Sequence, residues 1–235
     1  MIAFHKLVLF DVDGTLLTPG PIPRTALAEA LSGFIGEPVE LDFHDVAGFT
    51  DPTIIRNALQ HNGYQRLIDA PVIETILTDY LALVTKRLPA SAGVRVFPGA
   101  KKLVLACRSE DWATALLTGN VRAGAELKLA HTGLEDLFAF GVFGEDGNSR
   151  EDLPWVARER AWEELSIAFP PADIILVGDT PNDARIARLN DIHSLIVCRR
   201  EEPEWRAGIE AESPTWMVDD FEAVADIIEL FKDQP

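Results

Sequence analysis

The sequence predicts an α/β protein, in which a parallel β-sheet with helices on both faces carries an all-helical insertion after its first strand. The apolar run Leu7–Phe10 ends at turn residues, which is typical of a buried strand. Residues 24–87 show helical spacing of apolar residues and no clear alternation. Beyond residue 97, short apolar runs alternate with helical patterns, and this alternation indicates a parallel sheet.

Two breaks bound the helical stretch. The segment Pro19–Pro23 contains three prolines and a glycine, so it cannot continue a helix and forms a stiff connector. Residues 89–93 form the second break, because proline, glycine and serine interrupt helical patterns there. We therefore predict a core domain of residues 1–18 and 93–235, with a helical cap domain of residues 19–92 inserted into it.

The strand pattern recurs four more times in the core. Further strands are predicted at Ala113–Leu117, Ala139–Phe143, Ile174–Val177 and Leu195–Val197. Helical patterns fall around residues 100–108, 121–131, 153–168 and 182–189. Because the carboxyl ends of parallel strands lie at one edge of a sheet, the residues that follow these strands are expected to meet there. The helical insertion follows the first strand at this same edge, so we expect the insertion to lie over the carboxyl ends of the strands.

The composition argues against several classes of protein. The net charge of -17 provides no basic field that would attract nucleic acid or an anionic membrane. No apolar run approaches the roughly 18 residues of a membrane span, and the N-terminus has no signal pattern. Cys107 and Cys198 lack metal-ligand spacing and are expected to be core residues in a reducing compartment. We expect a soluble cytoplasmic protein; the sequence leaves open whether it is a monomer or a homodimer.

Polar residues follow the predicted strands at the edge where ligands bind. They are Asp11 and Asp13 after the first strand, Thr118, Gly119 and Asn120 after the second, Arg150 beyond the third, and Asp179 and Asp183 after the fourth. Carboxylates placed two residues apart just beyond a strand are poorly suited to core packing. They are well suited to holding a cation or to chemistry on a phosphate.

These residue types fit magnesium-assisted phosphoryl transfer. Mg²⁺ prefers hard oxygen ligands, so Asp11 and Asp179 could hold it beside a substrate phosphate. One carboxylate can attack phosphorus to give an aspartyl-phosphate, and a second, Asp13, can protonate the leaving oxygen and later activate water. Thr118 and the amide after it can donate to phosphoryl oxygens, and Arg150 can neutralise the charge that develops there.

Three segments resemble motifs of the haloacid dehalogenase-like (HAD) hydrolase superfamily and occur in the family's order. They are Asp11-Val-Asp-Gly-Thr, Leu117-Thr-Gly-Asn and Gly178-Asp-Thr-Pro-Asn-Asp. The insertion looks like the family's C1 cap, and Gly48-Phe-Thr-Asp-Pro-Thr-Ile-Ile is similar to a cap segment of phosphoglycolate phosphatase-like members. The resemblance implies a Rossmann-like core and a Mg²⁺ cofactor. It also implies a small phosphorylated substrate, either phosphoglycolate-like or a sugar phosphate.

The resemblance also implies a role for each matching residue. Asp11 would be the nucleophile and a metal ligand, and Asp13 the general acid/base that binds the metal through its main-chain carbonyl. Asp179 would be a metal ligand and Asp183 a supporting carboxylate of the metal site. The phosphoryl group would be bound by Thr118, Gly119, Asn120 and Arg150.

The third-motif cation departs from the family pattern. The family usually has lysine there, whereas the best match in this chain is Arg150, within Ser149-Arg-Glu-Asp-Leu-Pro. Arginine binds phosphate through two parallel hydrogen bonds where lysine acts as a point charge, so the role is chemically tenable. Arg158 and Arg160 are rivals for it, although they fall in the following helical pattern, where a solvated face is the commoner explanation.

Simpler explanations compete with the first two motifs. Asp11 and Asp13 could be turn formers after a strand, with Gly14 closing the turn. Asn120 could cap the helix that follows it. Because several predicted strand ends carry such residues together, a catalytic site is favoured over these structural explanations.

The last motif is also a good helix start. Thr180 as N-cap, Pro181 in the first turn and Asp183 three residues after the cap account for Asp183 fully. They do not account for Asp179, which lies between the strand and the cap.

Other functions on the same scaffold stay open. A phosphomutase would pass the phosphoryl group to a second sugar hydroxyl, and a non-catalytic binding protein would have no need of intact Asp11, Asp13 and Asp179. Dehalogenase activity is disfavoured because true dehalogenases of this superfamily lack a second aspartate at the position of Asp13. Position alone makes four residues of the insertion candidates for substrate selection: Thr50, Asp51, Thr53 and Arg56. For Asp51 and Thr53, a helix start explains the pattern equally well.

Overall fold

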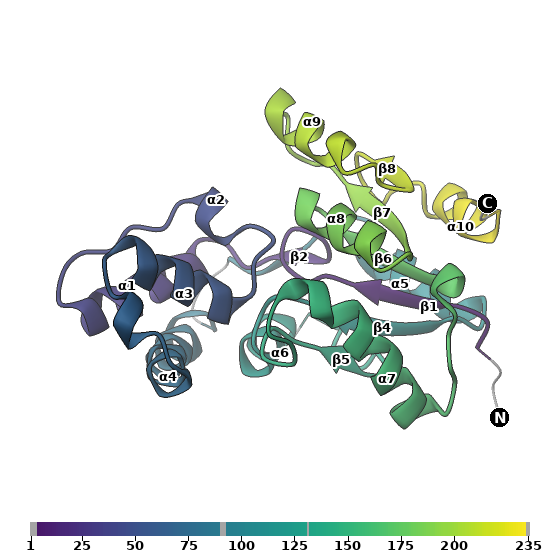
Figure 1. Cartoon of the computed structure of the whole chain (residues 1–235). Coiled ribbons are helices and arrows are strands. Elements are labelled where there is room, and N and C mark those ends of the chain that lie inside the picture. Colours follow the sequence, from purple (N-terminus) through teal and green to yellow (C-terminus); the bar gives the residue numbers. More distant parts are fainter. Residues whose placement is uncertain (1–3, 90–92, 131, 234–235) are drawn as a thin grey trace.

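The computed structural model describes residues 4–89, 93–130 and 132–233, and its core is one parallel sheet (Figure 1). The strand order is β5-β4-β1-β6-β7-β8, and every neighbouring pair is parallel. The strands are β1 (Leu7–Phe10), β4 (Ala113–Leu117), β5 (Gly141–Val142), β6 (Ile174–Gly178), β7 (His193–Val197) and β8 (Trp216–Val218). The prediction of a parallel α/β sheet is confirmed.

Strand β1 lies near the middle of the sheet because its side chains are apolar on both faces. Val8 and Phe10 belong to one core cluster, whereas Leu7 and Leu9 belong to the other. A strand that is buried on both faces is expected to be a continuous apolar run rather than an alternating one.

Helices cover both faces of the sheet. One face packs against α5 (Ala100–Ser109), α6 (Arg122–Leu129) and α10 (Val224–Lys232), and the other against α7 (Leu153–Leu165) and α8 (Pro181–Leu189). Helix α9 (Pro203–Ala211) packs beside α8, and short 3₁₀ turns occur at η2 (Arg150–Asp152) and η3 (Pro171–Asp173). This two-sided cover is the arrangement that the strand–helix alternation predicted.

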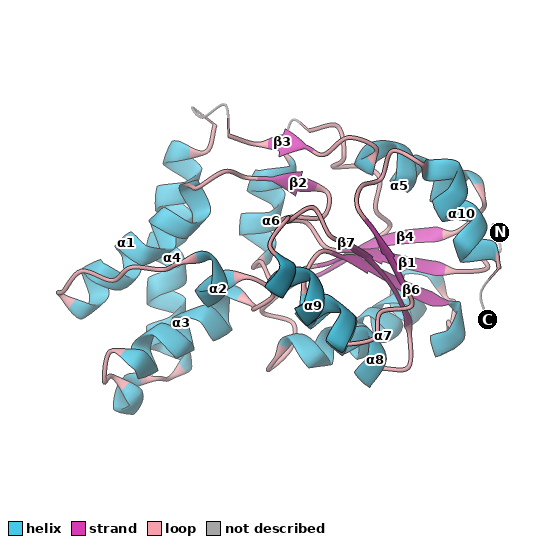
Figure 2. Ribbon diagram, turned by 90° about the horizontal axis from the view of Figure 1, so that it is seen from above, coloured by secondary structure: helices cyan, strands magenta, loops and turns pink. Residues whose placement is uncertain are grey.

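The insertion after β1 is helical, as predicted. It contains α1 (Ile22–Ile35), α2 (Phe43–Val46), α3 (Asp51–His61), the turn η1 (Gln65–Leu67) and α4 (Ala70–Arg87). Helices α1, α3 and α4 surround an apolar cluster of their own, and Figure 2 shows them to one side of the sheet. The domain bounds 1–18, 19–92 and 93–235 stay a prediction, and residues 90–92 of the second break lie outside the described residues.

The chain enters and leaves the insertion through an antiparallel pair that the sequence did not predict. Strands β2 (Leu17–Thr18) and β3 (Arg95–Val96) have two residues each, which is too short for a pattern to appear. The predicted strand Ala139–Phe143 is shorter than expected, at Gly141–Val142, and β8, α9 and α10 were not predicted. Strand β8 is an apolar but half-buried edge strand of three residues, which is too short for a strand pattern to be recognised.

Cys107 and Cys198 are buried free thiols, as expected. Within the residues that the structure describes, none of the helices has the length and apolar character needed to cross a membrane.

Candidate active site

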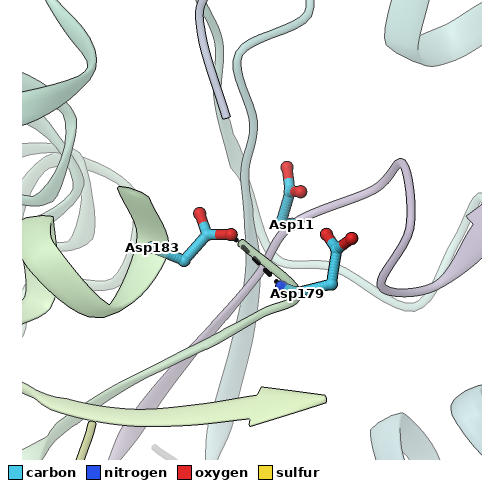
Figure 3. Close-up of side chains that lie close together, drawn as sticks. All are labelled: Asp11, Asp179 and Asp183. Atoms are coloured by element: carbon cyan, nitrogen blue, oxygen red, sulfur yellow. Dashed lines mark hydrogen bonds between the residues drawn. The ribbon is translucent and has the colours of Figure 1, made fainter. Parts of the chain in front are cut away.

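The carboxyl edge of the sheet gathers the acidic residues that follow β1 and β6. One carboxylate oxygen from each of Asp11, Asp179 and Asp183 lies within 4.8 Å of those of the other two (Figure 3). Asp11 and Asp179 line a cavity of about 430 Å³ between this edge and the insertion, whereas Asp183 is fully buried and does not line it. Of the predicted site residues, those that line the cavity are Asp11, Asp13, Thr118, Gly119, Asn120, Arg150 and Asp179.

Asp11 is held in place by the ends of two neighbouring strands. Its backbone N–H donates to the Val177 carbonyl at 2.9 Å, and its side chain is buried. Arg150 Nη2 lies 3.3 Å from Asp11 Oδ1. Burial raises the pKa of Asp11 above its ordinary value, and nearby Asp183 raises it further, while the Arg150 charge opposes the rise.

Asp179 is fitted against the turn that follows Asp11. Thr15 Oγ1 donates to Asp179 Oδ1 at 3.2 Å. Gly14 has a φ of 85°, and a Cβ at that position would lie 2.1 Å from Asp179 Oδ2. Burial, with the neighbouring charge of Asp11, raises the pKa of Asp179 well above its usual value. Because a Cβ at position 14 would collide with the Asp179 carboxylate, only glycine lets these two strand ends approach this closely.

Asp183 has both of its carboxylate oxygens engaged by protein donors. Oδ1 accepts from Arg150 Nη2 at 2.6 Å, and Oδ2 accepts from Thr180 Oγ1 at 2.7 Å and from the backbone N–H groups of Thr180 and Asp179. Thr180 and Asp183 form the capping box of α8. The helix-start explanation is thus confirmed, and the same carboxylate also fixes Arg150.

Arg150 is the cation that contacts this acidic group. Its side chain is 8% exposed, and its Nε has no hydrogen-bond partner among the described residues. Burial alone would lower the pKa of Arg150, but the charges of Asp183 and Asp11 outweigh it and raise the pKa. Arg160 instead pairs with Asp146 at 2.8 Å, and the lining of the cavity includes neither Arg158 nor Arg160.

Comparison with known proteins shows the family. The model of the haloacid dehalogenase-like hydrolases matches residues 5–191, which is most of the chain. The chain belongs to the haloacid dehalogenase-like hydrolases. The family resemblance of the three motifs is thereby confirmed, and the chain is an enzyme of the hydrolase class.

Relatives and solved structures agree with this assignment. A phosphoglycolate phosphatase of Cereibacter sphaeroides is 29% identical over 77% of this chain and 79% of its own. One of Nitrosospira multiformis is 26% identical over 82% of each chain. Among solved structures, a hydrolase from Pseudomonas syringae has a TM-score of 0.72 at 16% identity, covering 95% of this chain and 98% of its own. A beta-phosphoglucomutase from Clostridium difficile has a TM-score of 0.73 at 15% identity, covering 98% of this chain and 98% of its own. These structures establish likeness of fold.

The site of this hydrolase contains a buried lysine that the sequence analysis missed. Lys128 of α6 is 2% exposed, and its ammonium donates to Asp13 Oδ2 and Asn120 Oδ1. Asn120 does not cap α6, because Val121 is the N-cap and the Asn120 amide faces Thr118 and Lys128. Helical spacing from the buried Gly124 and Ala125 places Lys128 on the inward face of α6, and this signal could have identified it.

A second cation that the sequence did not predict, Arg199, stabilises the turn that follows Asp11. Arg199, just after β7, donates to the Gly14 carbonyl at 2.5 Å and the Thr15 carbonyl at 3.4 Å. Its guanidinium lies over the rings of Phe97 and Phe221, 4.1 and 4.8 Å from their centroids. These contacts fix the turn that carries Gly14 against Asp179.

The insertion of this hydrolase contacts the core through the turn at residues 48–51. The Asp51 N–H donates to the Gly119 carbonyl at 2.8 Å, and Asp51 Oδ2 accepts from the Val121 N–H at 2.9 Å. Asn182 Nδ2 donates to the Gly48 carbonyl at 2.9 Å. These hydrogen bonds bring the insertion onto the loops that follow β4 and β6.

The four residues proposed for substrate selection differ in position. Asp51 lines the cavity, whereas Arg56 does not. Thr50 is the N-cap of α3 and accepts from the Thr53 N–H at 3.2 Å, so the helix start accounts for both threonines. Arg24 is the cation that the insertion contributes to the lining. Other lining side chains from the insertion are mostly apolar or aromatic: Leu27, Phe43, Val46, Phe49, Ile54 and Tyr80.

The acidic residues fit a divalent cation such as Mg²⁺. Buried carboxylates repel one another, and this repulsion contributes to the raised pKa values of Asp11 and Asp179. A hard cation with oxygen ligands would remove it. Because Asp183 already accepts hydrogen bonds on both oxygens, Asp11 and Asp179 are the better side-chain ligands of the three.

Proposed function

We propose that the chain is a Mg²⁺-dependent phosphatase that hydrolyses a small phosphorylated metabolite through an aspartyl-phosphate on Asp11. The observation that carries the proposal is the position of Asp11 in the lining of the cavity, 3.3 Å from Arg150 and beside Asp179. The substrate would be phosphoglycolate-like or a sugar phosphate, and the phosphoglycolate phosphatase relatives support the first of these. We also propose a cytoplasmic location, which the two free buried thiols support.

In the first step, an Asp11 carboxylate oxygen attacks phosphorus and the bond to the leaving oxygen breaks. Asp13 gives its proton to that oxygen, so the product leaves as an alcohol. Arg150, whose Nε is free of other partners in the described chain, and Thr118 bind the phosphoryl oxygens as their charge changes.

In the second step, Asp13 takes a proton from water and the water oxygen attacks phosphorus. The bond to Asp11 breaks, which releases inorganic phosphate and restores the carboxylate. Mg²⁺ held by Asp11, Asp179 and the main-chain carbonyl of Asp13 would offset the repulsion between carboxylate and phosphate.

Asp11→Asn tests the proposal. We expect it to abolish turnover of an aryl phosphate while the circular dichroism spectrum and the melting temperature stay close to those of the wild type. The exposed Asp226→Asn on α10 is the matched control and should keep full activity. Near wild-type turnover by Asp11→Asn would refute the mechanism. Turnover that survives strong chelation would refute the metal requirement.

A phosphomutase remains the second candidate, and the contacts of the turn at residues 48–51 favour it. A mutase must shield its phosphoenzyme from water, and an insertion bound onto the site provides shielding. Incubation with hexose 1-phosphates separates the two functions. Isomerisation without release of phosphate would identify a mutase, and release of phosphate a phosphatase.

A further inference from the structure

The buried ammonium of Lys128 connects the proposed acid/base to the proposed phosphoryl site. Its hydrogen bonds reach Asp13 Oδ2 on one side and Asn120 Oδ1 on the other, and Asn120 Nδ2 continues to Thr118 Oγ1 at 2.8 Å. We propose that Lys128 is a positioning residue that holds Asp13 for proton transfer and orients Asn120 so that Thr118 donates to the substrate. The inference rests on the proposed phosphatase function.

The direction of these hydrogen bonds follows from the lysine. An ammonium group is a donor only, so the Asn120 atom next to it must be the amide oxygen. The Asn120 nitrogen therefore faces Thr118 and donates to the hydroxyl oxygen. Because Thr118 Oγ1 accepts there, its own hydrogen is left to donate, and Thr118 lines the cavity. Lys128 thus determines, through Asn120, that the hydroxyl is a donor toward a phosphoryl oxygen.

The same lysine leaves one oxygen of Asp13 for chemistry. Oδ2 accepts from Lys128, whereas Oδ1 is buried without a hydrogen-bond partner among the described residues. Oδ1 therefore has no protein donor that would compete for the proton it would give to the leaving group and take from water. A carboxylate that is fixed through one oxygen has fewer orientations for the other, and proton transfer depends on such geometry.

A purely structural role would not call for a cation at this position. The neighbouring buried positions of α6 are Gly124, Ala125 and Leu129, so an apolar side chain would suit the face. Burying an ammonium is costly unless charged and polar partners surround it. Here the partners are the proposed acid/base and the loop after β4, and all of them line the cavity. The site therefore uses two cations, Arg150 beside Asp11 and Lys128 beside Asp13.

Lys128→Met tests the inference by the dependence of rate on the leaving group. p-Nitrophenolate leaves without a proton, so the burst of p-nitrophenol that reports the first step should slow by only about 5- to 10-fold, which is what loss of the oriented Thr118 donor costs. An alkyl phosphate such as phosphoglycolate needs the proton, and its kcat/KM should fall by about 100-fold. Loss of the oriented Thr118 donor should weaken competitive inhibition by inorganic phosphate by about 5- to 10-fold.

The exposed Lys102→Met on α5 is the matched control and should leave the two rates and the inhibition unchanged. Equal losses on both substrates, or no loss on either, would overturn the role of Lys128 toward Asp13. Unchanged inhibition by phosphate would overturn the role toward Thr118. Lys128→Arg, which keeps the charge, should restore part of the rate on the alkyl substrate.

The melting temperature shows whether Lys128→Met folds. If it does not, Lys128→Gln keeps an N–H donor without the charge and allows the same comparison of substrates. Failure of the wild type and of Lys102→Met on every phosphate ester would refute the phosphatase function itself. A working wild type with an unchanged substrate ratio in the Lys128 variants would refute only the inference.

Discussion

The Asp51 carboxylate of the insertion accepts a hydrogen bond from the Val121 N–H of the core at 2.9 Å. This contact places a buried negative charge at the start of α6. Burial raises the pKa of Asp51 to about 6, against the opposing charge of Lys128. The insertion is thus bound to the core by a carboxylate that folding makes harder to ionise.

The Asp51 contact predicts a pH-dependent gain in stability for Asp51→Asn. A pKa that is higher in the folded state means that Asp51 favours folding when protonated. That contribution is complete below about pH 4 and is lost as the pH rises through about 6. Two pKa units correspond to about 3 kcal/mol. Asparagine can still accept from Val121 but never ionises, so at pH 8 we expect the variant to be more stable by about 1–3 kcal/mol.

The measurement is urea unfolding of the wild type and of Asp51→Asn at pH 4 and pH 8. Groups that titrate alike in the two proteins cancel in the difference between their free energies of unfolding, so this difference reports on Asp51. The gain should shrink toward zero at pH 4. A difference that does not vary with pH would show that the Asp51 charge is well solvated in the folded state.

Gly14→Ala should disable the site through Asp179. The new Cβ would lie 2.1 Å from Asp179 Oδ2, and the φ of 85° would strain any residue with a side chain. Moving Asp179 would disturb the proposed metal site, so we expect kcat to fall by about 100-fold or more. The measurement is steady-state turnover of an aryl phosphate, alongside thermal unfolding.

Gly36→Ala is the control for backbone strain. Gly36 has a φ of 83° and no atom within 4 Å of the added Cβ. It should lose about 1 kcal/mol of stability and keep its activity. Equal losses of activity in the two variants would mean that strain, and not contact with Asp179, controls the rate.

Arg150→Lys tests whether the arginine is needed in place of the family's usual lysine. One guanidinium nitrogen contacts both Asp183 and Asp11, and the buried Nε has no partner among the described residues. A shorter point charge cannot keep all of these contacts. We expect kcat/KM to fall by about 10- to 100-fold, because each hydrogen bond to a charged group contributes about 1.5–3 kcal/mol.

Arg160→Lys is the matched control, because Arg160 pairs with Asp146 outside the cavity lining. It should alter stability slightly and leave kcat/KM unchanged. Wild-type kinetics for Arg150→Lys would indicate that charge alone is sufficient at this position.

The acidic residues could be predicted from the sequence because their signal is local. Asp11 and Asp179 each follow an apolar strand, and strand ends of a parallel sheet converge whatever the rest of the chain does. The helical spacing of α6 places Lys128 on its inward face but does not show what Lys128 contacts, and Arg199 has no local signal. Their roles depend on how α6 and the end of β7 dock against the turn after Asp11, which is a tertiary relationship.

In the helical insertion, too, the sequence predicts the local structure but not the tertiary contacts. Its helices follow from apolar spacing, and their packing into one cluster is confirmed. Which of its residues face the site could not be predicted, because that depends on how the turn at residues 48–51 sits on Gly119. A close approach of backbones leaves little trace in the sequence beyond a glycine.

Arg24 should select substrates that carry a second negative charge. It is the cation that the insertion contributes to the cavity lining, whereas the lining near it is largely apolar. Phosphoglycolate carries a carboxylate close to its phosphate, and a phenyl ester does not. If Arg24 binds that carboxylate, Arg24→Leu should lower kcat/KM for phosphoglycolate by about 10- to 100-fold and kcat/KM for phenyl phosphate by less than about 3-fold.

Arg56→Leu is the matched control, because Arg56 is half-buried in the same insertion but lies outside the cavity lining, and it should change neither value of kcat/KM. An equal loss on both esters would show that Arg24 acts on the phosphate or on the fold, and would place the choice of substrate in the apolar wall.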